Sequence, residues 1–416
     1  MVWYINNYFF LIKNFYCNSK YQICVPTKYI YQLLMIKRKT NQIKLLFFGY
    51  PSNATSYTGG LLWMKKVADH IDKNSHYSVS KIYNYYVDKK LPFKIIYDIV
   101  NILKALGGYP HIAILDAWGE PNIVLWILLR LLKPKTKIFI VFHHHEPRIL
   151  SCKNFFEYMY NFIIEKAIVS MLKDSDMILT VSQASKRQLN NVYGIETDKI
   201  NKIKEKPDKK NSKLTKDIKN KIAIVGTGID KSFCFKNKNK EKNKKDIDFL
   251  CIGRFEKFHG LENIWIQIKE EIPNARLVVI GRISEENIGR LYKMGIDHRG
   301  FVSEKEKSSL YSKSKVFIFP SSMEGFGIAV AEAIYANIPV VAWKLPVFEE
   351  FYLKDNRIKI KLIEYGNYNL FANECIKTLN EYGNVKKHDE GKRAVFQIPS
   401  WQTVAKNVMT TIDSVI

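Results

Sequence analysis

The sequence lacks the long apolar runs and the cysteine spacing that define several protein classes. No stretch of about 18 uncharged apolar residues occurs, so we expect no segment that spans a bilayer. The strongest candidate, Ile123–Leu132, is too short and contains Arg130, which favours a buried helix. The 6 cysteines show no CxxC spacing, which argues against a zinc ribbon or a disulfide framework. We therefore expect a cytoplasmic protein, and contact with the cytoplasmic face of a membrane stays open.

Acidic residues are also few. The chain of 416 residues has 40 Asp and Glu against 65 Lys and Arg, which gives a formal net charge of +25. Such an excess attracts polyanions such as nucleic acid, an anionic membrane surface or phosphorylated substrates. Because abundant Lys accompanies abundant Ile, Asn and Tyr, the composition also fits an AT-rich genome, so charge alone assigns no partner. We interpret the Lys-rich stretches 201–221 and 236–245 as solvated surface loops.

Residues 1–40 lack the features of a secretory signal. Lys13, Lys20 and Lys28 interrupt the apolar stretches, and no small-residue cleavage site follows them. We interpret this segment as an N-terminal extension outside the fold, with Met35 as an alternative start. An interfacial membrane anchor is the competing interpretation.

From Ile43 onward, short apolar runs alternate with longer amphipathic stretches. This pattern is typical of strand–helix units that build a parallel sheet, so we predict an α/β protein. The expected helices include Leu261–Glu271, Glu285–Lys293 and Ile328–Ala336. The expected strands are Ile43–Phe48, His111–Leu115, Lys137–Phe142, Met177–Val181 and Ile222–Val225, followed by Asp248–Gly253, Arg276–Ile280, Lys315–Phe319, Pro339–Trp343 and Arg357–Ile363.

The most informative segment is Phe317–Ala333, where a strand, a glycine loop and a helix follow one another directly. Backbone N–H groups at a helix N-terminus favour a phosphate, and Gly325 and Gly327 let the backbone approach it closely. Glu324 lies in the loop, and Glu332 lies inside an otherwise apolar helix. A carboxylate is expensive to bury unless it faces a cleft or a partner, so we expect Glu332 to accept a ribose diol. A solvent-facing Glu332 is the alternative.

This segment resembles the E-x7-E signature of retaining glycosyltransferases with the GT-B fold, specifically glycosyltransferase family 4, the glycosyl transferases group 1. The resemblance extends over residues 43–410 and includes Gly228-Ile229-Asp230, the region of Ser182, and Ser400-Trp401. Asn337 stands where the family usually has a turn glycine, and Asn tolerates left-handed geometry. The resemblance implies two Rossmann-like domains whose parallel sheets face each other across a cleft.

The length of the chain also favours two domains. At 416 residues it exceeds the size that one hydrophobic core usually reaches, and its content of 47% hydrophobic and 25% charged residues is typical of globular proteins. We predict an N-terminal extension at 1–40, an acceptor domain at 41–227, a nucleotide-sugar domain at 228–395, and a C-terminal helix at 396–416 that packs back on the acceptor domain.

The resemblance also implies roles for individual residues. Glu324 is expected to contact the donor sugar and Glu332 the nucleotide ribose. Arg254 is expected to bind the diphosphate, a role that suits an always-ionised guanidinium. Where the family usually has the next cation, a Lys, this chain has His259, and Lys257 is the alternative. The other predicted donor-binding residues are Gly325, Phe326, Gly327, Ile328, Gly59 and Gly60.

Three histidines, His143, His144 and His145, follow the strand that ends at Phe142. The resemblance implies that a histidine here approaches the transferred sugar, so His143 and His144 are predicted catalytic residues. Three adjacent histidines also suggest a metal, but neighbours at a strand end point in different directions and no second ligand cluster is evident.

Asp174-Ser175-Asp176 imitates the metal-binding DxD motif of another transferase fold. It precedes a predicted strand instead of following one, so we do not assign it a metal. The resemblance implies no cofactor and no obligatory metal, with Arg254 and helix N–H groups stabilising the leaving diphosphate instead.

The predicted function is transfer of a sugar from a nucleotide-sugar donor to a hydroxyl of a glycan or lipid-linked acceptor, with retention of configuration. The apolar and basic segments Leu91–Leu106 and Asn122–Lys135 favour a peripheral membrane contact. A sugar-nucleotide epimerase on the same fold is one alternative. A basic nucleic-acid-binding scaffold is the other, but the Lys-rich loops lack interleaved aromatics, so nucleic acid is not the expected partner.

Overall fold

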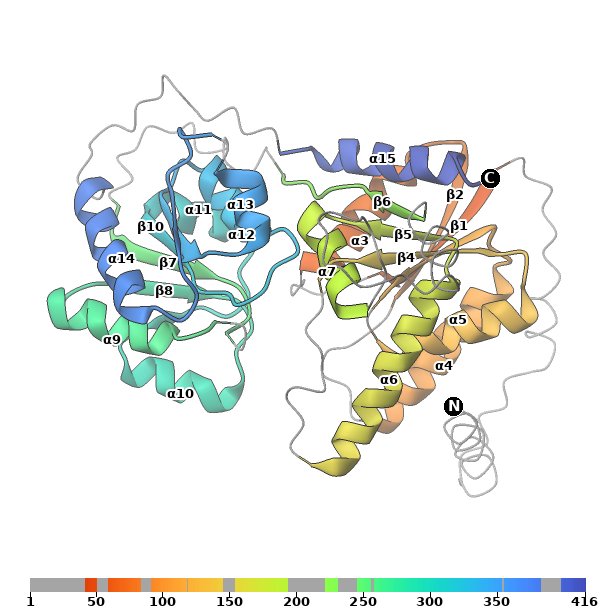
Figure 1. Cartoon of the computed structure of the whole chain (residues 1–416), viewed down its shortest axis with the longest axis horizontal. Helices are drawn as coiled ribbons and strands as arrows, with labels where there is room; N and C mark the ends of the chain where they lie inside the picture. Colours follow the sequence, from red (N-terminus) through yellow and green to blue (C-terminus); the bar gives the residue numbers. More distant parts are fainter. Residues whose placement is uncertain are drawn as a thin grey trace, which may run out of the picture. The chain divides into compact units, whose positions relative to one another are not determined.

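The computed structural model describes residues 42–50, 59–83, 91–117, 119–144, 154–193, 221–230, 245–255, 258–353, 355–382 and 398–416. The N-terminal extension, His145, Lys257 and most of the two Lys-rich stretches lie outside these ranges. Within them, the chain forms two six-stranded sheets with helices packed around each (Figure 1). Among the helices in these ranges, none combines the length and the hydrophobicity needed to cross a bilayer.

The first sheet has the strand order β2-β1-β3-β4-β5-β6. Strands β1 and β3 pair in parallel, and so do β5 and β6, as expected for strand–helix units. The elements of this half are β1 (Ile43–Tyr50), α3 (Gly59–Ile71), β2 (Tyr77–Tyr83), α4 (Leu91–Gly107), β3 (Ile112–Asp116), α5 (Glu120–Leu132), β4 (Lys137–Phe142), α6 (Phe155–Asp174), β5 (Met177–Thr180), α7 (Gln183–Tyr193) and β6 (Ile222–Ile224).

The second sheet has the order β12-β11-β10-β7-β8-β9, and its neighbouring strands pair in parallel. The elements of this half are β7 (Ile247–Ile252), α9 (Leu261–Glu271), β8 (Leu277–Ile280), α10 (Glu285–Lys293), β9 (Asp297–His298), α11 (Glu304–Lys313), β10 (Ser314–Phe319), α12 (Ile328–Tyr335), β11 (Val340–Trp343), α13 (Pro346–Tyr352), β12 (Ile360–Ile363), α14 (Tyr368–Tyr382) and α15 (Trp401–Asp413).

The strands were predictable from the sequence because they are buried apolar runs. Residues Val316–Phe319 of β10 and Val340–Trp343 of β11 are all buried, as is typical of parallel strands covered on both faces. Serine side chains cap two of the helices. Ser303 caps α11 by accepting a hydrogen bond from the N–H of Glu306, and Ser400 caps α15 by accepting one from the N–H of Thr403.

The strand order of the second sheet reverses between β7 and β10. From β7 the chain proceeds outward to β8 and β9, and from β10 it proceeds outward in the other direction to β11 and β12. Open α/β sheets bind ligands at the carboxyl ends of the strands at such a reversal. The loops after β7 and β10 contain most of the predicted donor-binding residues, so the fold brings them to one place.

By internal contacts the chain groups into two compact units. One contains Ser75–Phe139, Pro147–Asp176 and the chain up to Phe48, and the other contains Gly49–Asn74, Ile140–Glu146 and Met177–Ile416. Every predicted site residue within the described ranges falls in the second unit. Helix α15 packs against α3 inside that unit. The predicted domain boundaries at residues 40, 227 and 395 stay predictions.

Candidate functional site

The loops after β7 and β10 are joined by backbone contacts. The N–H of His259 donates to the carbonyl of Pro320 at 2.8 Å, and Phe258 forms an isolated bridge with Ser321. Each loop leads into a helix, α9 or α12, so two helix N-termini start from the same edge of the sheet. Exposed N–H groups and the helix dipole at such ends favour an anion.

Both helices start from a glycine in the left-handed region. Gly260 has φ 74° before α9, and Gly327 has φ 79° before α12. A Cβ at Gly260 would lie 2.2 Å from Cε1 of Tyr368, and one at Gly327 would lie 2.5 Å from Cε1 of Phe348. Conformation and space therefore both require glycine. Asn337 has φ 58°, which confirms the left-handed turn predicted for it.

Glu332 is buried, with 7% of its surface exposed, so the solvent-facing alternative is wrong. Its Oε1 accepts a hydrogen bond from Nζ of Lys307 at 2.9 Å, and its Oε2 lies 3.2 Å from the hydroxyl of Tyr311. Burial raises the pKa of Glu332, and the positive charge of Lys307 opposes that rise. The sequence indicated that a buried Glu332 would face a cleft or a partner, but it did not identify Lys307 and Tyr311.

Glu324 lies in the loop between β10 and α12 and is half-buried. Oγ of Ser321 donates to its Oε1 at 2.9 Å, a contact that orients the carboxylate and that the sequence did not indicate. The E-x7-E spacing thus separates a half-buried acid before the helix from a buried one inside it. The two acids are suited to contacts with different parts of one ligand.

Arg254 follows β7 and is exposed, with no hydrogen bond or ion pair to another residue of the described ranges. His259, the predicted second cation, is engaged: its Nε2 lies 2.6 Å from the hydroxyl of Tyr368, and its ring stacks on Tyr365 with centroids 4.8 Å apart. Lys257, the alternative cation, lies outside the described residues. Arg254 is therefore the better-placed cation of the described pair for an incoming diphosphate.

His143 is 8% exposed, and its Nε2 has no hydrogen-bond partner among the described residues. Burial lowers the pKa of its imidazole to about 4, so the ring is neutral at physiological pH. Its edge meets Trp63 with ring centroids 5.7 Å apart, and a Cβ at Gly60 would lie 2.9 Å from its Cδ2. A buried ring nitrogen without a partner is suited to a polar ligand. His144 is half-buried beside it.

Gly325 lies against the backbone of His143 inside the second unit. A Cβ at Gly325 would come within 2.2 Å of the carbonyl oxygen of His143, so only glycine fits. The hydroxyl of Ser182 donates to the carbonyl of Gly325 at 2.8 Å, and Ser185 donates to the carbonyl of His143 at 2.5 Å. Ile328 is close as well, because a Cβ at Gly59 would lie 3.7 Å from its Cδ1. The structure therefore brings both predicted glycine loops and His143 together.

Phe326 completes the loop but does not face a ligand. It is buried, and its ring packs edge-on against Phe351 with centroids 4.9 Å apart. Its side chain therefore anchors the loop, and any contact with a donor would come from its backbone.

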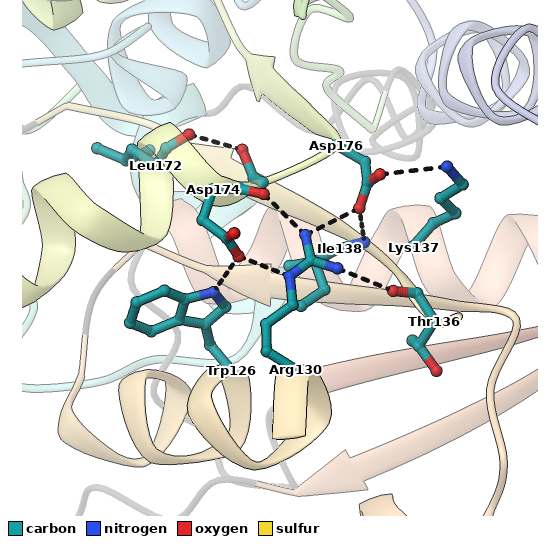
Figure 2. Close-up of polar contacts among 9 residues, drawn as sticks. Trp126, Arg130, Thr136, Lys137, Ile138, Leu172, Asp174 and Asp176 are labelled. Carbon is teal, nitrogen blue, oxygen red and sulfur yellow. Dashed lines mark hydrogen bonds and ion pairs between the residues drawn. The ribbon is translucent and has the colours of Figure 1, made fainter. Parts of the chain in front are cut away.

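Asp174 and Asp176 belong to an ion network in the first unit (Figure 2). The guanidinium of Arg130 donates to both carboxylates, at 2.6 and 3.1 Å. Asp174 also accepts from the indole N–H of Trp126, and Asp176 accepts from the backbone N–H of Ile138. The figure shows both carboxylates turned toward this one guanidinium. Among the described residues no group of three or more His, Cys, Asp or Glu is arranged to hold a metal ion.

Residues 233–394 match the sequence model of the family "Glycosyl transferases group 1". This part of the chain is similar to that family. The match contains Arg254, Glu324 and Glu332, so it confirms the resemblance on the residues that carried it. Membership of family 4 in particular stays a prediction.

Related proteins agree with this assignment. The O-antigen chain mannosyltransferase RfbU of Salmonella typhimurium is 26% identical over 241 residues, which are 54% of this chain and 62% of RfbU. The chain spans less than two thirds of the length of the curated relatives named here and of others that it matches.

Solved structures confirm the GT-B fold. A glycosyltransferase from Rickettsia africae ESF-5 aligns with TM-score 0.60 and 17% identity over 90% of this chain and 99% of that one. The UDP-GlcNAc 2-epimerase of Methanocaldococcus jannaschii aligns with TM-score 0.50 and 14% identity over 89% and 99%. The fold is thus shared by two kinds of enzyme, and the activity has to be argued from the site.

Proposed function

We propose that the protein is a retaining glycosyltransferase that moves a sugar from a nucleotide-sugar donor to a hydroxyl of a glycan or lipid-linked acceptor. The observation that carries this proposal is the placement of Glu324 and Glu332 on either side of the Gly327 helix start, inside the family-matched segment. Glu324 would contact the sugar, the N–H groups at the start of α12 would bind the diphosphate, and Glu332 would accept the ribose hydroxyls.

Breaking the bond between the anomeric carbon and the diphosphate leaves negative charge on the diphosphate. The N–H groups at the start of α12 and the guanidinium of Arg254 would stabilise that charge, so we propose a reaction without an obligatory metal or cofactor. The carboxylates of Asp174 and Asp176 support this, because Arg130 occupies both.

The sugar end of the site would be formed by Glu324 and the neutral imidazole of His143. A neutral ring with a free nitrogen donates to or accepts from a sugar hydroxyl without placing a positive charge beside the developing oxocarbenium ion. His144 remains a second candidate for contact with the sugar.

We also propose that the first unit rests on the cytoplasmic face of a membrane. The N-terminal half of α6 exposes Phe155, Phe156 and Ile163 at 70, 83 and 47% of their surfaces. Helix α5 packs against both α6 and α4, and α4 and α5 expose further apolar side chains, such as Leu103 at 61% and Leu131 at 71%. Apolar patches with nearby lysines are suited to an interface with anionic lipids. Such a location would bring the enzyme to a lipid-linked acceptor.

The proposal is tested by thermal unfolding with a panel of nucleoside diphosphates and nucleotide sugars. Binding to the folded state raises the melting temperature. We expect one nucleotide class to raise the melting temperature of the wild-type protein. The same nucleotides should not raise the melting temperature of Glu332→Gln or of Arg254→Ala. Arg357→Ala, which alters an exposed arginine paired with Asp355, is the control that keeps the shift. Absence of a shift with every nucleotide in the folded protein would contradict the proposal.

An epimerase on the same fold is distinguished by its product. A transferase yields free nucleoside diphosphate and a glycosylated acceptor, whereas an epimerase yields an isomerised donor or free sugar without an acceptor. Analysis of products after incubation with the stabilising donor, with and without candidate acceptors, separates the two. Configuration at the new glycosidic bond then tests retention.

A further inference from the structure

Lys307 and Glu332 form an ion pair that is largely withdrawn from water. Nζ of Lys307 lies 2.9 Å from Oε1 of Glu332, with the two side chains exposed at 14 and 9%. Glu304, on the same helix as Lys307, contributes a third charge at 3.1 Å from Nζ but is itself 71% exposed. The buried part of this cluster is therefore one ammonium and one carboxylate.

Stability alone does not explain this pair. Removing two charges from water costs free energy that their attraction often fails to recover, and apolar residues of similar size frequently serve as well. Helix α12 is otherwise apolar around Glu332, with Val330, Ala331 and Ala333 buried. A charged pair at this point of the helix that starts at Gly327 therefore calls for a functional reason.

By its count of lone pairs, Glu332 can accept two more hydrogen bonds. A carboxylate offers about four lone-pair positions on its two oxygens. Lys307 occupies one on Oε1, and the hydroxyl of Tyr311 lies beside Oε2. Tyr311 is itself fixed, because its hydroxyl also lies 3.0 Å from the carbonyl of Ala329. One position on each oxygen remains, which matches the two neighbouring hydroxyls of a ribose.

We propose that Lys307 is a positioning residue that holds Glu332 as an ionised, fixed acceptor for a ribose 2′,3′-diol, and so gives the site its preference for ribonucleotides. This inference rests on the proposed function, because it assumes that a nucleotide binds at α12. Lys307 acts through Glu332 and does not itself touch the ligand.

The charges around Glu332 determine how the preference should depend on pH. Burial raises the pKa of Glu332, Lys307 lowers it, Glu304 raises it, and the Tyr311 hydroxyl lowers it. Burial alone would lower the pKa of Lys307, but Glu332 and Glu304 raise it overall. Lys307 is therefore charged throughout the neutral range. Its removal should raise the pKa of Glu332 further.

The test compares affinity for the nucleoside diphosphate that stabilises the wild-type protein with affinity for its 2′,3′-dideoxy analogue, measured by calorimetry. We expect the wild-type protein to prefer the ribonucleotide by about 10- to 100-fold, the range for hydrogen bonds to a charged group. Measured at pH 7 and at pH 9, Lys307→Met should lose more of that preference at the lower pH, because loss of the Lys307 charge raises the pKa of Glu332. Lys307→Arg should retain it, and Glu332→Gln should lose it at both pH values.

Lys315→Met is the matched control, because Lys315 forms a similar pair with Asp248 at 2.7 Å in the same unit. It should leave the preference unchanged. If Lys307→Met folds, binds the ribonucleotide and keeps the full preference at both pH values, Lys307 is structural and the inference is wrong. If Lys307→Met fails to fold, loss of the preference in Lys307→Arg would overturn the inference and its retention would support it. Absence of nucleotide binding to the wild-type protein would overturn the proposed function, and this inference with it.

Discussion

The imidazole of His143 lies so close to Gly60 that a Cβ on the glycine would come within 2.9 Å of the ring. The same ring is buried and keeps an Nε2 without a described partner. Burial keeps this ring neutral at physiological pH.

His143 should make stability fall with acid between about pH 6.5 and about pH 4. Burial lowers the pKa of its imidazole from 6.5 to about 4 in the folded protein. Between those values the unfolded chain binds a proton that the folded chain does not, so folding loses up to about 1.4 kcal/mol per pH unit as the pH falls. Denaturant unfolding at a series of pH values should show a shallower slope for His143→Gln. His76→Gln, at an exposed histidine, should match the wild-type slope.

Gly327→Ala should destabilise the protein more than an alanine substitution at a left-handed glycine normally does. The substitution forces alanine into φ 79° and places its Cβ against Phe348. Backbone strain costs about 1–2 kcal/mol, and the overlap adds to it. Gly295→Ala isolates the strain, because Gly295 has φ 66° with no atom within 4 Å of its Cβ position. If the two variants lose the same free energy of unfolding, the ring of Phe348 moves aside for the new Cβ without a measurable penalty.

Asp176→Asn should reduce stability by about 1.5–3 kcal/mol without affecting nucleotide binding, because the carboxylate holds Arg130 and a backbone N–H rather than a ligand. Burial alone would raise the pKa of Asp176, but the Ile138 N–H and Arg130 lower it overall. Its contribution is therefore present above the unfolded pKa and disappears as the pH falls through the folded value. A rise in melting temperature with manganese or magnesium that Asp176→Asn abolishes would instead identify a metal site.

Phe155→Ser combined with Phe156→Ser should weaken binding to vesicles that contain anionic lipid. These two rings are 70 and 83% exposed at the start of α6. Each substitution removes an apolar side chain that would insert into the membrane interface. Co-sedimentation with vesicles of neutral and anionic composition measures the effect. Tyr292→Ser, at a ring 82% exposed on α10, is the control and should bind as the wild type does. Equal binding by all three proteins would exclude α6 as the membrane contact.

Much of the fold was predictable because buried parallel strands are continuous apolar runs. Lys137–Phe142 and the helices Leu261–Glu271 and Glu285–Lys293 have the bounds that the sequence predicts. Strand β2 was missed. Its sequence, Tyr77–Tyr83, mixes serines and a lysine with apolar residues, as an edge strand can, because it stands at the end of the sheet order.

The site was predictable where the sequence around a single residue limits its environment. The apolar neighbours of Glu332 indicated an acid that faces a cleft or a partner, and the glycine loop indicated a helix start. The partners themselves were not predictable, because Lys307 lies 25 residues away on a helix whose packing only the fold determines. His259 shows the opposite limit. The resemblance placed it at the position of a diphosphate-binding cation, and in the structure its ring contacts Tyr368 and Tyr365.

The contacts of α15 have a consequence for biosynthesis. Ser400 pairs with Ile229, a Cβ at Gly228 would overlap the backbone of Trp401, and Asn407 donates to the carbonyl of Val225. The segment around Gly228 thus obtains its neighbours from a helix made about 170 residues later on the ribosome. Until α15 has emerged, the second unit of a nascent chain lacks the helix that packs against α3.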